Sequence, residues 1–232
     1  MILILGSNGQ VGRSMKILKP NKINAYFLDK DKCDITKTSV LRSYIKKLKP
    51  KYVVNVAAYT NVAKAEIEIN KANNTNAKSV KNLSMLSNEY NFILLHISTD
   101  YVFNGKIKNS YNEIHKPNPI SVYGKSKLLG EKQIIKIAKK FIIIRTSGIF
   151  SHFESSFLHK ILTHTRNEKE LFIVCDQICY PTYSFDLSRL LWSIVAENNK
   201  LKFNEIYHFT GHEYALSWFN FAKKAYRYAK EY

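Results

Sequence analysis

Short runs of apolar residues alternate along the chain with longer stretches in which apolar residues recur at helical spacing. The short runs predict buried strands, and the first five span residues 2–5, 24–29, 52–58, 91–98 and 141–147. Helical patterns begin near residue 10 and recur over residues 40–49, 72–89 and 120–139. A regular sequence of strand, helix and strand predicts a parallel sheet that is covered by helices on both faces. The expected fold class is therefore α/β, with a Rossmann-like, doubly wound parallel sheet.

The pattern becomes less regular after residue 150. It predicts helices over residues 157–166, 184–198 and 215–232, with strands over 171–176 and 205–211. No repeat or low-complexity linker separates the two parts, so we expect them to pack as one body. The predicted organisation is a dinucleotide-binding domain over residues 1–150 and a smaller, less regular C-terminal substrate lobe over residues 151–232.

The formal net charge of +18 is the strongest feature of the composition. A strongly basic chain suggests a nucleic-acid partner, but here the lysines are spread along the whole length without an aromatic-interleaved cluster. We therefore interpret the charge as a solvated basic surface and expect no nucleic-acid partner. Such a surface would also attract a doubly phosphorylated substrate.

Several features bear on location and metal content. No stretch approaches the ~18 uninterrupted apolar residues of a membrane span, and no basic leader precedes the first apolar run. Cys33, Cys175 and Cys179 form no CxxC pair, which argues against a disulfide framework or a zinc site. His208 and His212 are interpreted as a strand end and a turn. We expect a cytoplasmic protein with neither a membrane partner nor a bound metal.

The segment GSNGQVG, which contains Gly6, Gly9 and Gly12, follows a predicted strand and opens a predicted helix. In that context glycines allow a tight turn, and the helix N-terminus offers free N–H groups to a pyrophosphate. Asp29 ends the second strand, where a carboxylate commonly holds a ribose hydroxyl. Lys30 follows at once and could pair with a 2′-phosphate, so both NADH and NADPH stay open as the cofactor.

Tyr123 and Lys127 lie four residues apart in a predicted helix and therefore share one face. A free tyrosine is a poor acid at neutral pH, and a nearby cation lowers its pKa towards the working range. The fourth strand ends in Ser98, Thr99 and Asp100, at the edge where open α/β sheets bind ligands. A Thr99 hydroxyl at that edge could hydrogen-bond a substrate carbonyl beside the tyrosine.

With these motifs in this order, the sequence resembles the dTDP-4-dehydrorhamnose reductase family of extended short-chain dehydrogenases. The resemblance covers nearly the whole chain, and STDYVF together with VYGKSKLLGE is specific for this group. The segments that carry it are GSNGQVG, CDIT (33–36), NVAAYTNVAKAE (55–66), ISTDYVFNG (97–105), NPISVYGKSKLLGE (118–131), IIRTS (143–147), DQICYPT (176–182), IYHFTG (206–211) and LSWFNFA (216–222).

The resemblance implies a reaction and a set of site residues. The implied reaction is NADPH- or NADH-dependent reduction of the C4 carbonyl of dTDP-4-dehydro-L-rhamnose to dTDP-L-rhamnose, with Thr99, Tyr123 and Lys127 as the catalytic residues. Thr99 and Asp100 would also contact the sugar. The implied cofactor-binding residues are Gly6, Gly9, Gln10, Val11, Gly12, Asp29, Lys30, Asp34, Ile35, Ala58, Tyr59, Thr60, Tyr123 and Lys127. A homodimer is left open.

The chain also departs from the family pattern at specific places. Gly148 follows RTS where the family has a tryptophan that packs on the substrate, and Ala63 replaces an acidic residue. The family continues past the residue that matches Tyr232, so we expect a substrate lobe shortened at its C-terminal end. These differences leave two alternatives: a reductase of another nucleotide-linked 4-keto sugar, and a non-catalytic regulatory subunit that binds the dinucleotide.

Overall fold

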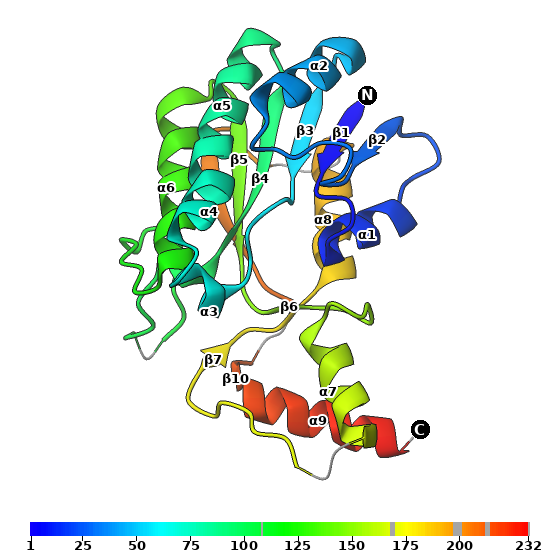
Figure 1. The fold of residues 1–232 in the computed structure, drawn as a ribbon, viewed down its shortest axis with the longest axis vertical. Helices are drawn as coiled ribbons and strands as arrows, with labels where there is room; N and C mark the ends of the chain where they lie inside the picture. The colour runs from blue at the N-terminus through cyan, green and yellow to red at the C-terminus, as the bar shows by residue number, and fades with distance from the viewer. Residues whose placement is uncertain (108, 168–169, 197–200, 212–213, 232) are drawn as a thin grey trace.

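A computed structural model describes residues 1–107, 109–167, 170–196, 201–211 and 214–231. Its centre is a six-stranded sheet with the strand order β2-β1-β3-β4-β5-β9, and every neighbouring pair is parallel (Figure 1). The strands are β1 (Ile2–Leu5), β2 (Ala25–Leu28), β3 (Tyr52–Asn55), β4 (Ile93–Thr99), β5 (Phe141–Thr146) and β9 (Glu205–Phe209). The predicted fold class is confirmed.

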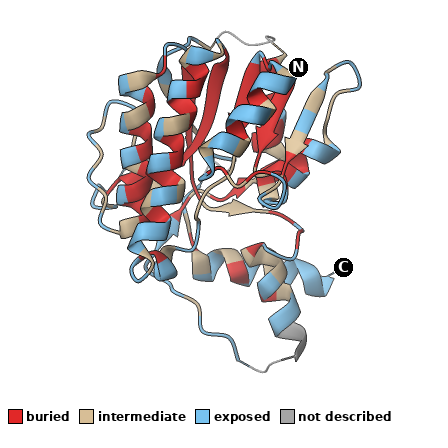
Figure 2. Cartoon of the chain, turned by 45° about the horizontal axis from the view of Figure 1, so that its top comes forward, coloured by how far each residue is buried: buried red, intermediate tan, exposed pale blue. Residues whose placement is uncertain are grey.

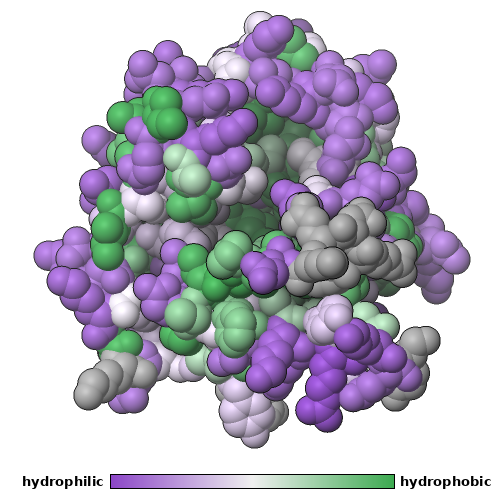
Figure 3. Space-filling model, turned by 60° about the horizontal axis from the view of Figure 1, so that its bottom comes forward, coloured by the Kyte–Doolittle hydropathy of each residue, from purple (hydrophilic) through white to green (hydrophobic). Residues whose placement is uncertain are grey.

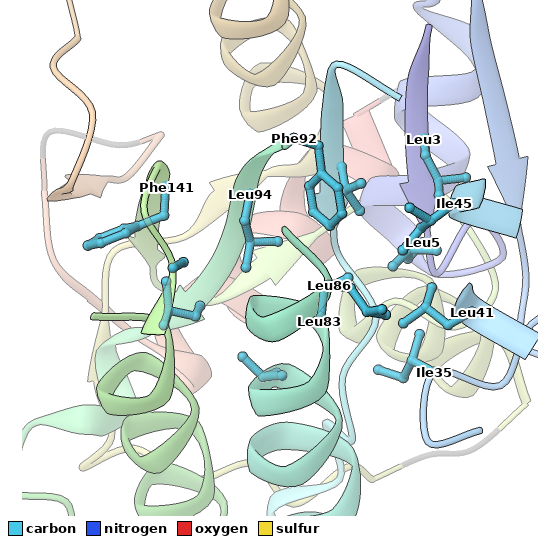
Figure 4. Close-up of a cluster of buried hydrophobic side chains, with 14 of the residues drawn as sticks. Leu3, Leu5, Ile35, Leu41, Ile45, Leu83, Leu86, Phe92, Leu94 and Phe141 are labelled. Atoms are coloured by element: carbon cyan, nitrogen blue, oxygen red, sulfur yellow. The ribbon is translucent and has the colours of Figure 1, made fainter. Parts of the chain in front are cut away.

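Helices cover both faces of this sheet, because successive strand residues point to opposite sides. Leu3 and Leu5 pack towards α2 (Thr38–Leu48), α5 (Ser79–Glu89) and α6 (Val122–Ile137), in a cluster shown in Figure 4. Ile2 and Ile4 pack on the other side, in a cluster with residues of α1 (Gln10–Ile17) and α8 (Ser184–Val195). Figure 2 shows the result: the helices are red towards the sheet and blue towards solvent.

The predicted helix over residues 72–89 contains a π-helical turn. It is built from α4 (Ile69–Asn73), the π turn η1 (Asn74–Lys78) and α5, and the short α3 (Val62–Ala65) precedes it. The turn lies close to α6, since a Cβ atom on Gly130 would be 2.2 Å from the Asn76 carbonyl oxygen. Such single π turns are frequent at functional sites.

The segment after residue 150 contributes to both parts of the molecule. β9 is the sixth strand of the main sheet, and α8 packs on α1, with Ser184 Oγ 2.7 Å from Ser14 Oγ. Trp192 Nε1 also donates to the Met15 carbonyl at 3.0 Å. The main sheet thus takes up a helix and a strand from the segment that the sequence pattern placed in the lobe.

The remaining elements form a small lobe beyond the sheet (Figure 1). They are α7 (Phe157–Asn167), α9 (Trp218–Glu231) and the antiparallel pair of β7 (Ile178–Cys179) and β10 (Leu216–Ser217). β6 (Ile149–Phe150) pairs with β8 (Thr182–Tyr183) at the junction. The predicted strand over residues 171–176 is wrong: that run has no ladder partner, and Phe172 is 93% exposed.

The cysteines, the possibility of a membrane span and the two histidines near residue 210 were the other subjects of prediction. Cys33, Cys175 and Cys179 are free thiols. In the part of the chain that the structure describes, no helix combines the length and apolarity needed to cross a membrane. His208 lies in β9, as expected for a strand end, whereas His212 falls outside the described residues.

Candidate active site

A cleft of about 1310 Å³ opens at the carboxyl ends of the central strands. Figure 3 shows the face of the molecule on which it opens, with an apolar hollow between polar rims. The predicted site residues that line the cleft are Gly6, Gly9, Gln10, Val11, Lys30, Asp34, Ile35, Ala58, Tyr59, Thr60, Thr99, Asp100, Tyr123 and Lys127. Gly12 and Asp29 are not among the lining residues.

The glycine turn between β1 and α1 forms one wall of the cleft. Gly6 has a φ of 88° and passes so close to the next loop that a Cβ would lie 2.7 Å from Ala57 Cα. A Cβ on Gly9, the N-cap residue of α1, would meet only the Gly6 carbonyl oxygen, at 3.4 Å. No side chain caps α1 and no acidic residue stands in its first turn, so its N-terminal amides are available to an anion.

Gly12 has a different role from the two glycines before it. A Cβ at this position would lie 2.4 Å from the Gly6 carbonyl oxygen. Gly12 therefore lets α1 pack closely against Gly6 and Ser7, on the side of the turn that does not line the cleft.

The residues after β2 are arranged differently from the expectation. The Asp29 carboxylate accepts the Lys32 backbone N–H at 2.9 Å and lies 3.8 Å from the Lys32 ammonium. It thus closes a local turn, while Lys30 lines the cleft. Asp34 also makes a local turn, because its Oδ1 accepts the backbone N–H and the hydroxyl of Thr36 at 2.9 and 2.7 Å.

The opposite wall, residues 58–60, is fastened to α6 by Asn76, which the sequence analysis missed. Asn76 Oδ1 accepts the Tyr59 N–H at 2.8 Å, and its Nδ2 donates to the Tyr59 carbonyl and to Ser126 Oγ, both at 3.0 Å. Ser126 Oγ donates in turn to the Tyr123 carbonyl at 2.7 Å. This buried amide joins the cleft wall to the helix turn that carries Tyr123.

Thr99 and Asp100 stand at the end of β4, at the floor of the cleft. Thr99 Oγ1 donates to Asp100 Oδ1 at 3.1 Å and accepts the Tyr101 N–H at 3.2 Å. Ser147 Oγ donates to the other carboxylate oxygen of Asp100. Burial raises the pKa of Asp100, and the hydrogen bonds from Ser147 and Thr99 oppose that shift. The carboxylate is held in a fixed orientation beside Thr99.

Tyr123 lies in the first turn of α6. The helix begins at Ser121, whose Oγ accepts the Gly124 N–H at 3.1 Å. A Cβ on Gly124 would lie 2.2 Å from the Tyr101 carbonyl oxygen, so only glycine lets the start of α6 sit against the 3-10 turn of residues 100–102 that follows β4. This close approach brings the Tyr123 phenol to Thr99.

Burial raises the pKa of Tyr123 above its ordinary value, and the hydrogen bond with Thr99 opposes the shift. The direction is the opposite of the sequence-based expectation, in which a nearby cation lowers this pKa. The reason is that the phenol is almost fully buried. The phenol is therefore protonated at neutral pH.

Lys127 is buried one turn further along α6, with its side chain 2% exposed. Its Nζ donates to the Ile97 carbonyl at 2.7 Å and lies 3.2 Å from His96 Nε2. Burial lowers the pKa of Lys127 to about 8, and the charge of Glu131 opposes that shift. Lys127 thus ionises close to physiological pH, which is unusual for a lysine.

Ser98 supports the assignment of this cleft to a ligand. Its hydroxyl is the one buried side-chain oxygen or nitrogen without a hydrogen-bond partner in the described ranges, and Ser98 lines the cleft. Such orphaned groups are rare in folded proteins. Together with the uncapped amides of α1 and the space above Gly9, it fits a bound dinucleotide.

The far end of the cleft reaches the small lobe. Gly148, Phe157, Lys160 and Trp218 line this end. A Cβ on Gly148, which has a φ of 44°, would lie 3.3 Å from Trp218 Cη2 and 3.1 Å from Cys179 Sγ. The indole of Trp218, held edge to face by the Phe157 ring at 4.6 Å, therefore stands beside the position that lacks a side chain. Trp218 was not predicted from the sequence, because this contact joins α9 to the turn before β6, which is distant in the chain.

Fold and cleft together define a Rossmann-type α/β protein with a ligand site at the carboxyl edge of its sheet. The family model described as the RmlD substrate binding domain matches residues 1–232. The chain belongs to this family, and the resemblance inferred from its motifs is confirmed.

Named relatives agree with this assignment. The chain is 39% identical over 226 residues to a dTDP-4-dehydrorhamnose reductase of Aggregatibacter actinomycetemcomitans, covering 95% of this chain and 76% of the relative. It is similar to the crystal structure of a Bacillus anthracis dTDP-4-dehydrorhamnose reductase in complex with NADP, with a TM-score of 0.92, 33% identity and coverage of 99% and 80%. A Clostridium acetobutylicum dTDP-4-dehydrorhamnose reductase gives a TM-score of 0.90 at 33% identity and the same coverage.

Proposed function

We propose that this chain is an NADPH-dependent reductase that converts the C4 carbonyl of dTDP-4-dehydro-L-rhamnose to the alcohol of dTDP-L-rhamnose. The observation that carries the proposal is the meeting of Thr99, Tyr123 and Lys127 with the glycine turn in one cleft. Relatives that share a third or more of its sequence are named for this activity.

The dinucleotide would lie across the carboxyl edge of the sheet. Its pyrophosphate would meet the amides at the start of α1, above Gly9, and the residues around Ala58 would line its other side. When bound, a reduced nicotinamide supplies the hydride. The chain supplies orientation, a proton donor and exclusion of water.

NADPH is the preferred cofactor in this proposal because of the charges after β2. The Asp29 carboxylate is already engaged by Lys32 and does not line the cleft, so it offers little to a ribose hydroxyl. Lys30 lines the cleft and would pair with a 2′-phosphate.

Tyr123 would donate a proton to the oxygen of the substrate carbonyl as negative charge develops there. A reduction needs the acid form of this group, and burial keeps the phenol protonated at neutral pH. Thr99 would hold the carbonyl oxygen beside the phenol, and Asp100 would accept a sugar hydroxyl. Lys127 would stabilise the phenolate that remains after proton transfer.

The sugar nucleotide would lie between the main sheet and the lobe formed by α7, α9, β7 and β10. Trp218 offers an apolar face to the sugar ring, and Lys160 offers a positive charge to its diphosphate. Gly148 favours a second candidate, reduction of another nucleotide-linked 4-keto sugar, because the missing side chain leaves Trp218 to define the pocket. We further propose a cytoplasmic location, in keeping with the three free thiols.

The test is a spectrophotometric assay of NADPH oxidation with dTDP-4-dehydro-L-rhamnose generated in place. Oxidation that needs both protein and sugar supports the proposal, and NADH in the same assay ranks the cofactors. Tyr123→Phe should bind NADPH normally and lose at least about 100-fold in turnover. Binding of NADPH by the wild-type chain without oxidation for any 4-keto sugar nucleotide would instead identify a non-catalytic dinucleotide-binding subunit.

A further inference from the structure

A buried chain of three side chains leads from beneath the cleft to Lys127, and the function proposed above uses only the last of them. It runs from Asn55 at the end of β3 through His96 in β4 to Lys127 in α6. The three side chains are 1%, 0% and 2% exposed. Because water does not reach them, the direction of each hydrogen bond is set by the protein alone.

The orientation of the Asn55 amide follows from its backbone neighbour. The Ala57 N–H points at one end of the amide, 3.2 Å away, and an N–H must meet the oxygen. The other end is therefore the NH₂ group, and it lies 3.1 Å from His96 Nδ1. His96 Nδ1 must then act as the acceptor.

The same logic fixes the proton on His96. Burial lowers the pKa of His96 well below its ordinary value, and a charge on Lys127 would lower it further, so the ring is neutral whether Lys127 is charged or not. A neutral ring whose Nδ1 accepts carries its proton on Nε2. This Nε2–H faces the Lys127 Nζ at 3.2 Å. A lysine nitrogen can accept that hydrogen bond only as a neutral amine.

We propose that His96 is a positioning residue for Lys127: its Nε2–H, oriented by Asn55, hydrogen-bonds the uncharged Lys127 amine and holds it at the floor of the cleft. The Ile97 carbonyl accepts a hydrogen from the same amine at 2.7 Å. When Lys127 takes up a proton, the contact with Nε2–H becomes repulsive and the Ile97 carbonyl is left as its partner. The ammonium is then free to turn into the cleft. The catalytic meaning of this switch rests on the proposed function.

The other titratable groups near Lys127 do not account for a neutral amine. Glu131, one turn further along α6, favours the charged form, although Arg145 of β5 pairs with it. Tyr123, one turn before, is protonated and uncharged at neutral pH. Burial and the His96 donor therefore act together against the charge of Glu131.

The first test uses the wild-type protein without dinucleotide. Two-bond ¹H–¹⁵N spectra of the histidine rings distinguish the Nε2–H from the Nδ1–H tautomer, and loss of one ring signal in His96→Gln assigns it. We expect His96 to be neutral with its proton on Nε2 between pH 6 and 9. An Nδ1–H tautomer or a charged ring would overturn the proposal.

The second test follows the ionisation of Lys127 itself. In protein labelled with ¹³C at the lysine ε-carbons, Lys127 should titrate near or below pH 8, apart from the surface lysines. In Asn55→Leu, His96 can carry its proton on Nδ1, and its Nε2 can then accept a hydrogen bond from the Lys127 ammonium. The titration midpoint of Lys127 should therefore rise by about 0.5 to 1 pH unit. His96→Gln is the matched control: with Asn55 intact its amide NH₂ takes the place of Nε2–H, and the midpoint should stay within about 0.3 unit.

An unchanged or lowered midpoint in Asn55→Leu would overturn the proposal, as would a rise of similar size in His96→Gln. Both readouts are independent of turnover. Absence of ketosugar reduction by the wild-type chain would therefore refute the proposed function and leave the positioning role to be judged by the spectra. If the function holds, the pH dependence of turnover should move with the Lys127 midpoint in Asn55→Leu and stay in place in His96→Gln.

Discussion

The buried ion pair between Arg145 and Glu131 gives the sharpest prediction for stability. Arg145 in β5 donates to both carboxylate oxygens of Glu131 in α6, with Nε–Oε1 and Nη2–Oε2 distances of 2.9 and 2.7 Å. The side chains are 4% and 1% exposed, so solvent screens the interaction little. Arg145 also lies over the Phe103 ring, 5.2 Å from its centroid.

Glu131→Gln keeps the shape of the side chain and leaves the arginine charge buried without a counter-ion. Breaking one partner of a buried pair costs about 3 to 5 kcal/mol. For a chain of this size that corresponds to a melting temperature lower by about 6 to 20 °C. The assay is thermal unfolding followed by circular dichroism, with urea unfolding at fixed temperature to give the free energy directly.

Asp186→Asn is the matched control, because it breaks the Asp186–Arg189 pair on the surface of α8, in which the side chains are 43% and 62% exposed. It should cost at most about 1 kcal/mol. The double variant Glu131→Leu with Arg145→Met should unfold at a higher temperature than Glu131→Gln, because no unpaired charge is left buried. A Glu131→Gln protein that melts within about 2 °C of wild type would refute the reasoning.

Three further predictions follow from the cleft. The pKa of Lys127 is lowered to about 8 in the folded protein, against about 10.4 in the unfolded chain. Between these two pH values the folded protein binds fewer protons than the unfolded chain, so its stability rises with pH. The buried charge of Lys127 therefore destabilises the folded protein most below pH 8. Lys127→Met removes this penalty and also the hydrogen bond to the Ile97 carbonyl. The free energy of urea unfolding should therefore rise by a net value of roughly 2 kcal/mol at pH 7, and this gain should vanish near pH 10. Gly9→Val should lower the melting temperature by only a few degrees, because valine is a poorer N-cap than glycine but its Cβ meets only one protein atom. It should weaken NADPH binding at least about tenfold in a fluorescence titration, since the side chain otherwise enters the ligand space. Lys30→Ala should raise the KM for NADPH about tenfold or more and leave the KM for NADH almost unchanged, because one charge-assisted hydrogen bond to a 2′-phosphate is lost; equal effects on both cofactors would contradict this.

Hydrophobic periodicity predicted the main sheet well because its four inner strands, β1, β3, β4 and β5, are buried on both faces. Ile2–Leu5 is wholly apolar and Phe141–Thr146 begins with four apolar residues, and such short buried runs between helices are typical of strands in a parallel sheet. The same rule failed for residues 171–176. An apolar run becomes a strand only if a ladder partner lies beside it, and that partner is set by the rest of the fold.

Placement of the segment after residue 150 depended on contacts that join distant parts of the chain. The pattern predicted α8 and β9 as elements but could not attach them to the main sheet. The hydrogen bond from Trp192 to Met15 spans 177 positions, and β9 pairs with β5 across a long excursion through the lobe. Neither contact leaves a local signal in the sequence.

Most of the residues predicted from motif spacing and resemblance line the cleft, and Gly12 and Asp29 do not. Asp29 stands where a ribose-binding carboxylate is expected, but the turn after β2 brings the Lys32 N–H to it instead. Trp218 was not predicted because it lies far from the other site residues in the sequence, so no motif indicates its position beside Gly148.

The pattern of polar residues in the strands could have predicted the buried residues beneath the cleft. On the face of the sheet that packs against α6, the apolar pattern ends in a polar residue on each of four strands: Asn55, His96, Arg145 and His208. The pairing register places Asn55 beside His96, and it places Arg145 between Ser98 and His208, two residues nearer the carboxyl edge. The four residues therefore lie at two successive levels of the sheet and form a polar layer two levels deep. A buried polar group is costly unless it is hydrogen-bonded, and here Lys127 and Glu131 reach down from α6 to complete the layer. Helix α6 is thereby fixed over the sheet by directional bonds rather than by apolar packing alone, and the position of Tyr123, one turn before Lys127, follows from that attachment. A polar residue that ends several neighbouring buried strands on one face is therefore a sequence signal for the layer that supports an active site.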